Sequence, residues 1–288
     1  MKYAEKYSAS EMMAAVCAKQ IRNDDVAFIG VGIPLIAAAV AAATHAPDVI
    51  LAYEGGGVGA KTRRMPWTIS DSPTTDNALI AGSMNGIFSD LQRGFITVGI
   101  IGGAECDKFG NLNTTVIFGR DGSYDHPRVR LPGSGGANDI ASSALRTVIV
   151  MRLQKGKFVE KIDFNTSPGH LIGYDSRKKA GLLGGGPVAV VTDRGLFKFD
   201  EVTKEMYLDA IYPGETVEQI KELIAWELKV SPQLTEIEPP TVEQIKIMRD
   251  LDPLGTVLGS KSMQGDVEPF DDYYQALKKS YSGIKLVL

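Results

Sequence analysis

The chain has 288 residues, of which 44% are apolar and 23% charged, a composition typical of a globular protein with a sizeable buried core. Its formal net charge of -4 gives no electrostatic case for binding nucleic acid. Two cysteines, Cys17 and Cys106, do not make a disulfide framework or a zinc-binding spacing, so we expect no metal and a cytoplasmic location. The longest apolar stretch, Ile33 to Ala43, is too short to span a membrane.

Helices and strands alternate along the N-terminal part of the chain. Ser8 and Ser10 are capping residues, and the helix formers that follow predict a shallow amphipathic helix ending near Ile21. Apolar runs predict strands at 26–31 and 49–53, with a helix from Pro34 to Ala43 between them. The pattern continues with expected helices at 77–90 and 139–145 and expected strands at 94–101, 147–151 and 161–170. Such alternation predicts parallel strands joined by right-handed crossovers.

The C-terminal part has a different pattern. Two apolar runs, 188–192 and 196–199, flank Asp193-Arg-Gly195 and predict a β-hairpin, extended by a strand at 206–212. Capped helices are expected from Thr216 and Thr241. We therefore expect an α/β fold with an open, mostly parallel sheet, flanking helices and a small antiparallel region toward the C-terminal part. No linker divides the chain, so one domain over 1–288 is expected, with 253–288 as a C-terminal extension of uncertain structure.

The stretch from Val49 to Gly59 is the strongest candidate for chemistry. An apolar run leads into Tyr53 and Glu54, and three glycines follow. Glu54 is therefore expected at the carboxyl end of a buried strand, where open α/β sheets place their ligands. Glycines beside it let a backbone or a bulky ligand come close. A glutamate in this position can serve as a nucleophile or as a general base.

A second candidate is the run Gly133-Ser134-Gly135-Gly136-Ala137-Asn138, which precedes a predicted helix. A helix N-terminus presents backbone N–H groups suited to a phosphate or a developing oxyanion. On its own, such a run is also typical of an ordinary loop.

Other polar residues are weaker candidates. Glu105 and Asp107 follow a strand but fit a turn, and Lys61, Arg63 and Arg64 fit either a phosphate site or a solvated loop. The three histidines sit in breakers or loops and form no recognisable triad. Gly30-Val-Gly32 lacks the third glycine of a dinucleotide fingerprint, so a nicotinamide cofactor is not expected.

Several short stretches, in one order along the chain, carry a resemblance to a known family. They include Gly32-Ile-Pro-Leu-Ile36, Glu54 followed by glycine, Ile101-Gly-Gly-Ala104, Gly110-Asn-Leu-Asn113, Gly133-Ser-Gly-Gly-Ala-Asn138 and Thr166-Ser-Pro-Gly169. Over residues 8–252 the chain resembles the B (β) subunits of glutaconate CoA-transferases, within the family I CoA-transferases.

The resemblance implies an enzyme that works with a partner A (α) subunit, as α2β2 or a larger hetero-oligomer, with the active site at their interface. It implies transfer of CoA from an acyl-CoA to a carboxylic acid through a glutamyl-CoA thioester, with CoA as a substrate and no permanently bound cofactor. Glu54 matches the catalytic glutamate. Residues expected to line the site or bind CoA are Gly55, Gly56, Gly133, Ser134, Gly135, Gly136, Ala137 and Asn138.

One position departs from the family pattern. The pattern usually reads Glu-Ser-Gly at the catalytic turn, whereas this chain has Glu54-Gly55-Gly56. A CoA-thioester hydrolase or lyase, ring-opening or decarboxylating, is therefore an alternative, with Glu54 as a general base. Relatives with those activities characteristically lack the glutamate, so its presence favours transfer. A non-catalytic interaction subunit is the least favoured reading, because a carboxylate at a buried strand end costs desolvation energy.

Overall fold

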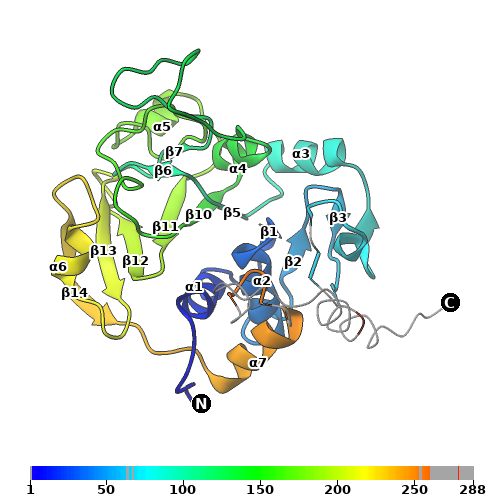
Figure 1. Cartoon of the computed structure of the whole chain (residues 1–288). Helices are drawn as coiled ribbons and strands as arrows, with labels where there is room; N and C mark the ends of the chain where they lie inside the picture. Colours follow the sequence, from blue (N-terminus) through cyan, green and yellow to red (C-terminus); the bar gives the residue numbers. More distant parts are fainter. Residues whose placement is uncertain (1, 63–64, 67, 253–254, 260–277, 279–288) are drawn as a thin grey trace. The chain divides into compact units, whose positions relative to one another are not determined.

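A computed structural model of the chain describes residues 2–62, 65–66, 68–252, 255–259 and 278. The chain divides into two compact units (Figure 1). The first unit comprises Met1–Asp25, Ile29–Ile87 and Pro239–Leu288, and the second comprises Val26–Phe28 and Phe88–Glu238. The single domain expected over 1–288 stays a prediction. Most of the expected extension at 253–288 lies outside the described residues.

Three helices pack against one another in the first unit: α1 (Ala9–Ala18), α2 (Ile33–Ala43) and α7 (Val242–Leu251). A capping box starts α1, since the Ser8 hydroxyl accepts from Glu11 N (3.2 Å) and the Glu11 carboxylate accepts from Ser8 N (2.7 Å). The expectation of a shallow amphipathic helix is wrong, because every residue from Ser10 to Ala18 is buried. The buried Glu11 carboxylate is paired with Arg249 of α7, whose Nε lies 2.7 Å away.

The strands of the first unit form an antiparallel arrangement, β2 (Ile50–Ala52), β3 (Gly57–Val58) and β4 (Ile80–Ala81). A 3-10 helix, η1 (Ser72–Thr75), lies between β3 and β4 in the chain. The helix expected at 77–90 is wrong in its first half, because β4 occupies it and α3 (Met84–Gln92) starts only afterwards. Pairing with β3 overrides the local helical pattern there.

The second unit is built on a sheet in the order β14-β13-β12-β11-β10-β5-β1. Four of its neighbouring pairs are parallel and two, β11–β12 and β12–β13, are antiparallel. The bounds are β1 (Val26–Phe28), β5 (Val98–Ile101), β10 (Arg146–Val150), β11 (Pro187–Val191), β12 (Gly195–Phe199), β13 (Met206–Ile211) and β14 (Lys229–Glu236). The α/β fold with a mostly parallel sheet and a C-terminal antiparallel region is thus confirmed.

Shorter elements complete the second unit. The helices are α4 (Ala137–Ser143), α5 (Ser176–Lys179) and α6 (Val217–Lys221), and two small hairpins pair β6 (Glu105–Cys106) with β7 (Leu112–Asn113) and β8 (Val116–Ile117) with β9 (Val129–Arg130). The strand expected at 161–170 is wrong, since this stretch is irregular and holds only the isolated bridge of Ser167 to Leu112. Strand β14 was not expected, because its exposed polar residues show no apolar alternation.

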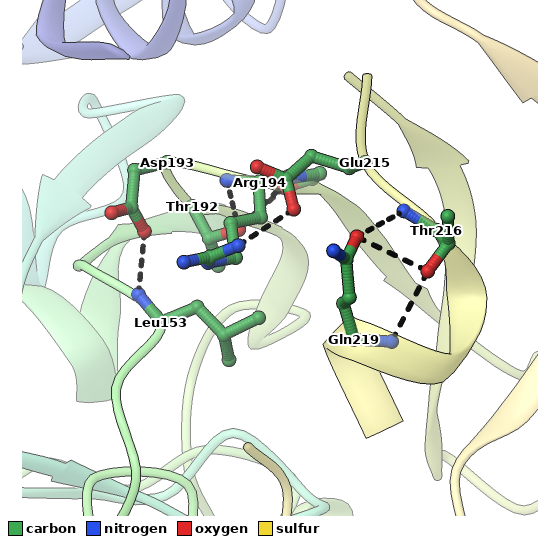
Figure 2. Close-up of polar contacts among 8 residues, drawn as sticks. Leu153, Thr192, Asp193, Arg194, Glu215, Thr216 and Gln219 are labelled. Carbon is green, nitrogen blue, oxygen red and sulfur yellow. Dashed lines mark hydrogen bonds and ion pairs between the residues drawn. The ribbon is translucent and has the colours of Figure 1, made fainter. Parts of the chain in front are cut away.

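The predicted hairpin at Asp193-Arg-Gly195 is confirmed, with β11 and β12 antiparallel on either side (Figure 2). The Thr192 hydroxyl closes its turn by accepting from Arg194 N (3.2 Å) and Gly195 N (3.1 Å). The Asp193 carboxylate also accepts a hydrogen bond from Leu153 N (2.7 Å), which connects the turn to the segment that follows β10. Side chains within the turn therefore set the hairpin geometry.

Figure 2 also shows how α6 is joined to this hairpin. Arg194 Nη1 lies 2.7 Å from Oε2 of Glu215, the residue that precedes the N-cap of α6. Thr216 then caps α6 in a capping box with Gln219, as its sequence predicted.

Close packing of α4 on β5 depends on Gly99. A Cβ added to Gly99 would lie 2.2 Å from Ile140 Cγ2. This glycine therefore lets the helix that follows Gly133–Gly136 approach the sheet directly.

We expect Gly99→Ala to lower the free energy of unfolding by about 1–3 kcal/mol, because the added methyl overpacks the α4–β5 contact. Urea unfolding of the whole chain measures this change. Gly86→Ala is the matched control, since the nearest atom to its added Cβ is Ser83 Oγ at 3.5 Å and an alanine favours the helix. Equal stability of the two variants would contradict the packing account.

Candidate active site

Glu54 lies in the four-residue hairpin loop, 53–56, that joins β2 to β3. Tyr53 N donates to Gly57 O (2.8 Å) and Gly56 N donates to Tyr53 O (2.9 Å), which closes the loop around Glu54 and Gly55. Gly56 has a φ of +102°, a conformation that favours glycine at the end of such loops. The structure thus places Glu54 two residues beyond β2, at the carboxyl end of a strand as expected.

The three glycines after Glu54 are packed against backbone of their own chain. An added Cβ would lie 2.9 Å from Ile69 O at Gly55, 2.6 Å from Gly82 C at Gly56 and 1.9 Å from Thr74 O at Gly57. Backbone of residues 69, 74 and 82 therefore fills the space that these glycines leave open. A serine at position 55, as in the family pattern, would require the 69–70 segment to shift.

The Glu54 carboxylate is partly removed from water and has no polar partner among the described residues. The residue is half-buried, and burial raises the pKa of its carboxyl group. Within the part of the chain that the structure describes, no hydrogen bond or ion pair reaches this carboxylate. Its neighbour Tyr53 is buried in the first unit, and burial raises the pKa of the phenol to about 12. Glu54 is therefore fixed through its backbone, while the described residues leave its carboxylate unneutralised.

The run Gly133–Asn138 belongs to the second unit and leads into α4. Gly133 and Gly135 have φ values of +99° and +50°, and no atom lies within 4 Å of an added Cβ at either. Glycine is needed here for the backbone conformation, and the surface above it is open. Such an open backbone surface can accept a ligand.

Fewer N–H groups are available in this run than the sequence suggested. Gly133 N donates to Thr114 O (2.8 Å) and Ala137 N donates to Ser134 O (3.0 Å). These two amides cannot serve as donors to a ligand without breaking those bonds. Asn138 Oδ1 is buried and has no hydrogen-bond partner among the described residues.

Arg177 holds the other end of α4 and was not identified from the sequence. Its buried guanidinium donates to five backbone carbonyls, those of Ala141, Ser142, Pro168, Gly169 and Gly184, at 2.6–3.1 Å. Burial lowers the pKa of this group to about 10. Cations near helix C-termini satisfy the last carbonyls of a helix. Within the run Arg177-Lys-Lys179 no local signal separates this buried arginine from its exposed neighbours.

Glu105, Asp107 and His170 have structural partners. Glu105 accepts from Asn113 Nδ2 (2.6 Å), and Asp107 accepts from Asn111 Nδ2 (2.8 Å), so both stabilise turns. His170 is buried with Nε2 2.8 Å from Pro187 O, and burial lowers its pKa to about 4. No group of three or more His, Cys, Asp or Glu side chains that could hold a metal ion occurs among the described residues.

A cavity of about 380 Å³ lies elsewhere in the first unit. Its lining includes alanines of α2, Leu51 and Lys61, and Glu54 is not part of it. Arg63 and Arg64, which were considered together with Lys61, lie outside the described residues. Among the helices that are described, none has the length and apolar character needed to cross a lipid bilayer.

Known proteins of one family resemble this chain in sequence. The family model described as Coenzyme A transferase matches residues 10–223. The chain is 40% identical over 247 residues to the B subunit of 3-oxoadipate CoA-transferase from Pseudomonas knackmussii, covering 85% of this chain and 94% of that protein. It is also 40% identical over 256 residues to the B subunit of glutaconate CoA-transferase from Acidaminococcus fermentans, covering 86% and 93%.

A solved structure supports the same relationship. The crystal structure of glutaconate coenzyme A-transferase from Acidaminococcus fermentans superposes with a TM-score of 0.81 at 36% identity. The match covers 90% of this chain and 100% of that chain.

The raised pKa of Glu54 has a consequence for stability. A carboxyl whose pKa is higher in the folded than in the unfolded state binds more protons when folded, so stability falls as the pH rises through that interval. Replacing it by a neutral amide removes this cost. We expect Glu54→Gln to increase the free energy of unfolding relative to the parent chain more at about pH 7 than at about pH 4.

Urea unfolding at the two pH values measures this difference. Glu160→Gln, at an exposed position of the second unit, is the control for removing a carboxylate from the surface. A Glu54→Gln effect of the same size at both pH values would contradict the account.

Proposed function

The chain belongs to the coenzyme A transferase family, and from that premise we propose that it is the B-type subunit of an enzyme that moves CoA from an acyl-CoA to a carboxylic acid through Glu54. The observation that carries the proposal is the hairpin held by backbone contacts, which presents a half-buried carboxylate without a polar partner among the described residues at the end of a strand. Such a carboxylate is a suitable nucleophile, because it is held in place and only partly hydrated.

In the proposed reaction a Glu54 carboxylate oxygen attacks the thioester carbonyl carbon. The C–S bond breaks and the CoA thiolate leaves, which gives an anhydride between the acyl group and Glu54. The thiolate then attacks the glutamyl carbonyl, releasing the donor acid and leaving CoA on Glu54 as a thioester. The acceptor carboxylate attacks the glutamyl carbonyl of this thioester, which breaks the C–S bond, frees the CoA thiolate and gives an anhydride between the acceptor and Glu54. The thiolate then attacks the acceptor carbonyl of this anhydride, which forms the new acyl-CoA and frees the Glu54 carboxylate. No water molecule is consumed.

The other candidate residues have different proposed roles. Gly55 and Gly56, expected from the sequence to line the site, instead let the backbone at 69–70 and 82–83 approach and hold the loop. Gly133–Asn138 offers a backbone surface for CoA or the acyl group. Open space above Gly133 and Gly135 supports this second role. The donors available there are fewer than a free helix N-terminus would provide, since Gly133 and Ala137 use theirs internally.

A partner subunit is part of the proposal. The two relatives are both named as B subunits, which supports a heteromeric enzyme with an A-type chain, as α2β2 or a larger assembly. The unpaired state of Glu54 among the described residues supports the same view, because a nucleophilic carboxylate needs donors that hold its developing charges. We propose that the A-type chain supplies them.

We propose two candidates for the carboxylic acid substrate, 3-oxoadipate and glutaconate. Identity to the 3-oxoadipate and the glutaconate enzymes is 40% in each case, so it favours neither. Both acids are to be tried as acceptors in an activity screen.

Hydrolysis or lysis of a CoA thioester is the alternative. The raised pKa of Glu54 favours this alternative, because a carboxylate with a higher pKa is a better general base. Release of free CoA without any acceptor acid, at the rate of overall turnover, distinguishes this reaction from transfer.

We expect Glu54→Ala, assembled with its A-type partner, to lose CoA transfer by on the order of a thousandfold or more, because the covalent route is removed. Acyl-CoA formation from an added acceptor acid measures the loss. Glu160→Ala, at an exposed site, is the control and is expected to keep full activity. Full transfer by a folded, assembled Glu54→Ala enzyme would refute the proposal.

A further inference from the structure

Two exposed aromatic rings lie side by side on the second unit. Tyr124 belongs to the loop that joins β8 to β9, and its ring centroid lies 5.8 Å from that of Phe164. The guanidinium of Arg130, the last residue of β9, lies over the Tyr124 ring at 4.6 Å from its centroid. The exposed fractions are 50% for Tyr124 and 36% for Phe164. The hairpin therefore presents two adjacent rings and a cation to solvent.

Hydrogen bonds hold this cluster in place before any ligand binds. The Asp163 carboxylate accepts from Phe118 N (2.7 Å), which fixes the segment that carries Phe164 to the hairpin. Arg130 Nη2 donates to the backbone carbonyl of Tyr124, so the cation is fixed to the residue whose ring it covers. A surface that is already ordered loses less entropy when a ligand binds.

Arg128 adds a second cation to the same face of the hairpin. Its backbone N–H still bonds the opposite arm of the hairpin (3.2 Å), so the pairing of β8 with β9 extends to this residue. Side chains two residues apart on a strand share a face, which places Arg128 with Arg130. The loop also carries Asp121 and Asp125, but within the described part of the chain neither arginine is paired with a carboxylate. Both guanidinium groups can therefore bind an anion.

We call Tyr124, Phe164, Arg128 and Arg130 the aromatic–arginine surface. It lies close to the run Gly133–Asn138, because β9 leads directly into that run. Gly133 is three residues beyond Arg130, so their Cα atoms are at most about 11 Å apart. The backbone remains paired up to this point, since Gly133 N donates to Thr114 O (2.8 Å).

We propose that the aromatic–arginine surface binds the nucleotide end of CoA, its 3′-phosphoadenosine diphosphate. This inference rests on the proposed function, which brings CoA to Gly133–Asn138. Adenine fits the two rings, because nucleobases stack on aromatic side chains and on arginine planes. The phosphates fit the arginines, because a guanidinium binds phosphate oxygens in a bidentate manner. The nucleotide is the part of the substrates that combines a flat ring with several phosphates.

The first test compares two substrates that share the thiol arm and differ in the nucleotide. Full-length variants are assembled with the A-type chain and assayed with acyl-CoA and with acyl-pantetheine, which lacks the nucleotide. We expect Tyr124→Ala to lower kcat/KM for acyl-CoA about tenfold, because a base stack is lost, and to leave kcat/KM for acyl-pantetheine unchanged. Phe95→Ala is the matched control and is expected to behave as the parent does. Its ring is 56% exposed and lies under Arg93 at 5.2 Å, without a second ring.

The second test measures nucleotide binding without any reaction. The full chain is titrated with adenosine 3′,5′-bisphosphate by calorimetry. We expect Arg128→Gln to bind this probe at least tenfold more weakly than the parent and with a smaller dependence on salt, because a phosphate contact is lost. Arg93→Gln is the control for removing an arginine elsewhere on the second unit and is expected to bind as the parent does. Unchanged urea unfolding shows that the variants are folded.

Two results would overturn this assignment. One is an equal loss of kcat/KM for acyl-CoA and acyl-pantetheine in Tyr124→Ala, and the other is full affinity for the bisphosphate in both Tyr124→Ala and Arg128→Gln. If these variants also bind the A-type chain more weakly while they bind the bisphosphate normally, the surface is a protein interface instead.

Failure of this inference and failure of the proposed function are distinguishable, because binding of the bisphosphate requires no chemistry at Glu54. Glu54→Ala is expected to bind the bisphosphate as the parent does and to lose transfer. A parent enzyme that binds the bisphosphate at this surface and transfers no CoA would remove the proposed function and leave the nucleotide site in place. Transfer that depends on Glu54, together with bisphosphate binding that the surface variants do not change, would do the reverse.

Discussion

Thr74 O lies 1.9 Å from the position that a Cβ on Gly57 would take, and Gly82 C lies 2.6 Å from that of Gly56. These contacts require glycine, and through them backbone at 69–74 and 82–83 holds the hairpin that carries Glu54. A loop fixed in this way needs little reorganisation to present its carboxylate, which is how enzymes lower the entropic cost of reaction. The placement of Glu54 thus depends on the absence of side chains around it.

The hairpin that carries Glu54 also pairs with an exposed strand. Glu54 is half-buried, and its carboxylate has no hydrogen-bond partner among the described residues. Backbone contacts therefore hold the hairpin, while no described donor neutralises the charge of its carboxylate. Strand β4 pairs with the glycine strand on one side and exposes Leu79 and Ile80 on its surface. Desolvating a carboxylate is costly unless donors arrive with the group that excludes water. The proposed partner subunit would supply such donors while it excludes water from the carboxylate.

Local sequence patterns predicted the features that depend on local physics. The strand ending near Glu54, the turn at Asp193-Arg-Gly195 and the helix caps at Ser8 and Thr216 all follow from side chains acting on nearby backbone. Features that depend on distant partners were missed. Strand β4 lies in an apolar stretch typical of a helix, and only its pairing with β3 makes it a strand. Arg177 acts on carbonyls distant in sequence, which no local pattern reveals.

In the proposed reaction, Glu54 carries CoA as a covalent thioester during transfer. The most direct measurement treats the assembled enzyme with acyl-CoA in the absence of acceptor, reduces it with borohydride and analyses its peptides by mass spectrometry. We expect Glu54 alone to be converted to the corresponding alcohol. Removing excess acyl-CoA and adding the acceptor acid before the reductant is expected to prevent this conversion. Transfer that proceeds while the Glu54 peptide remains unmodified, or a modification at another carboxylate, would contradict this mechanism.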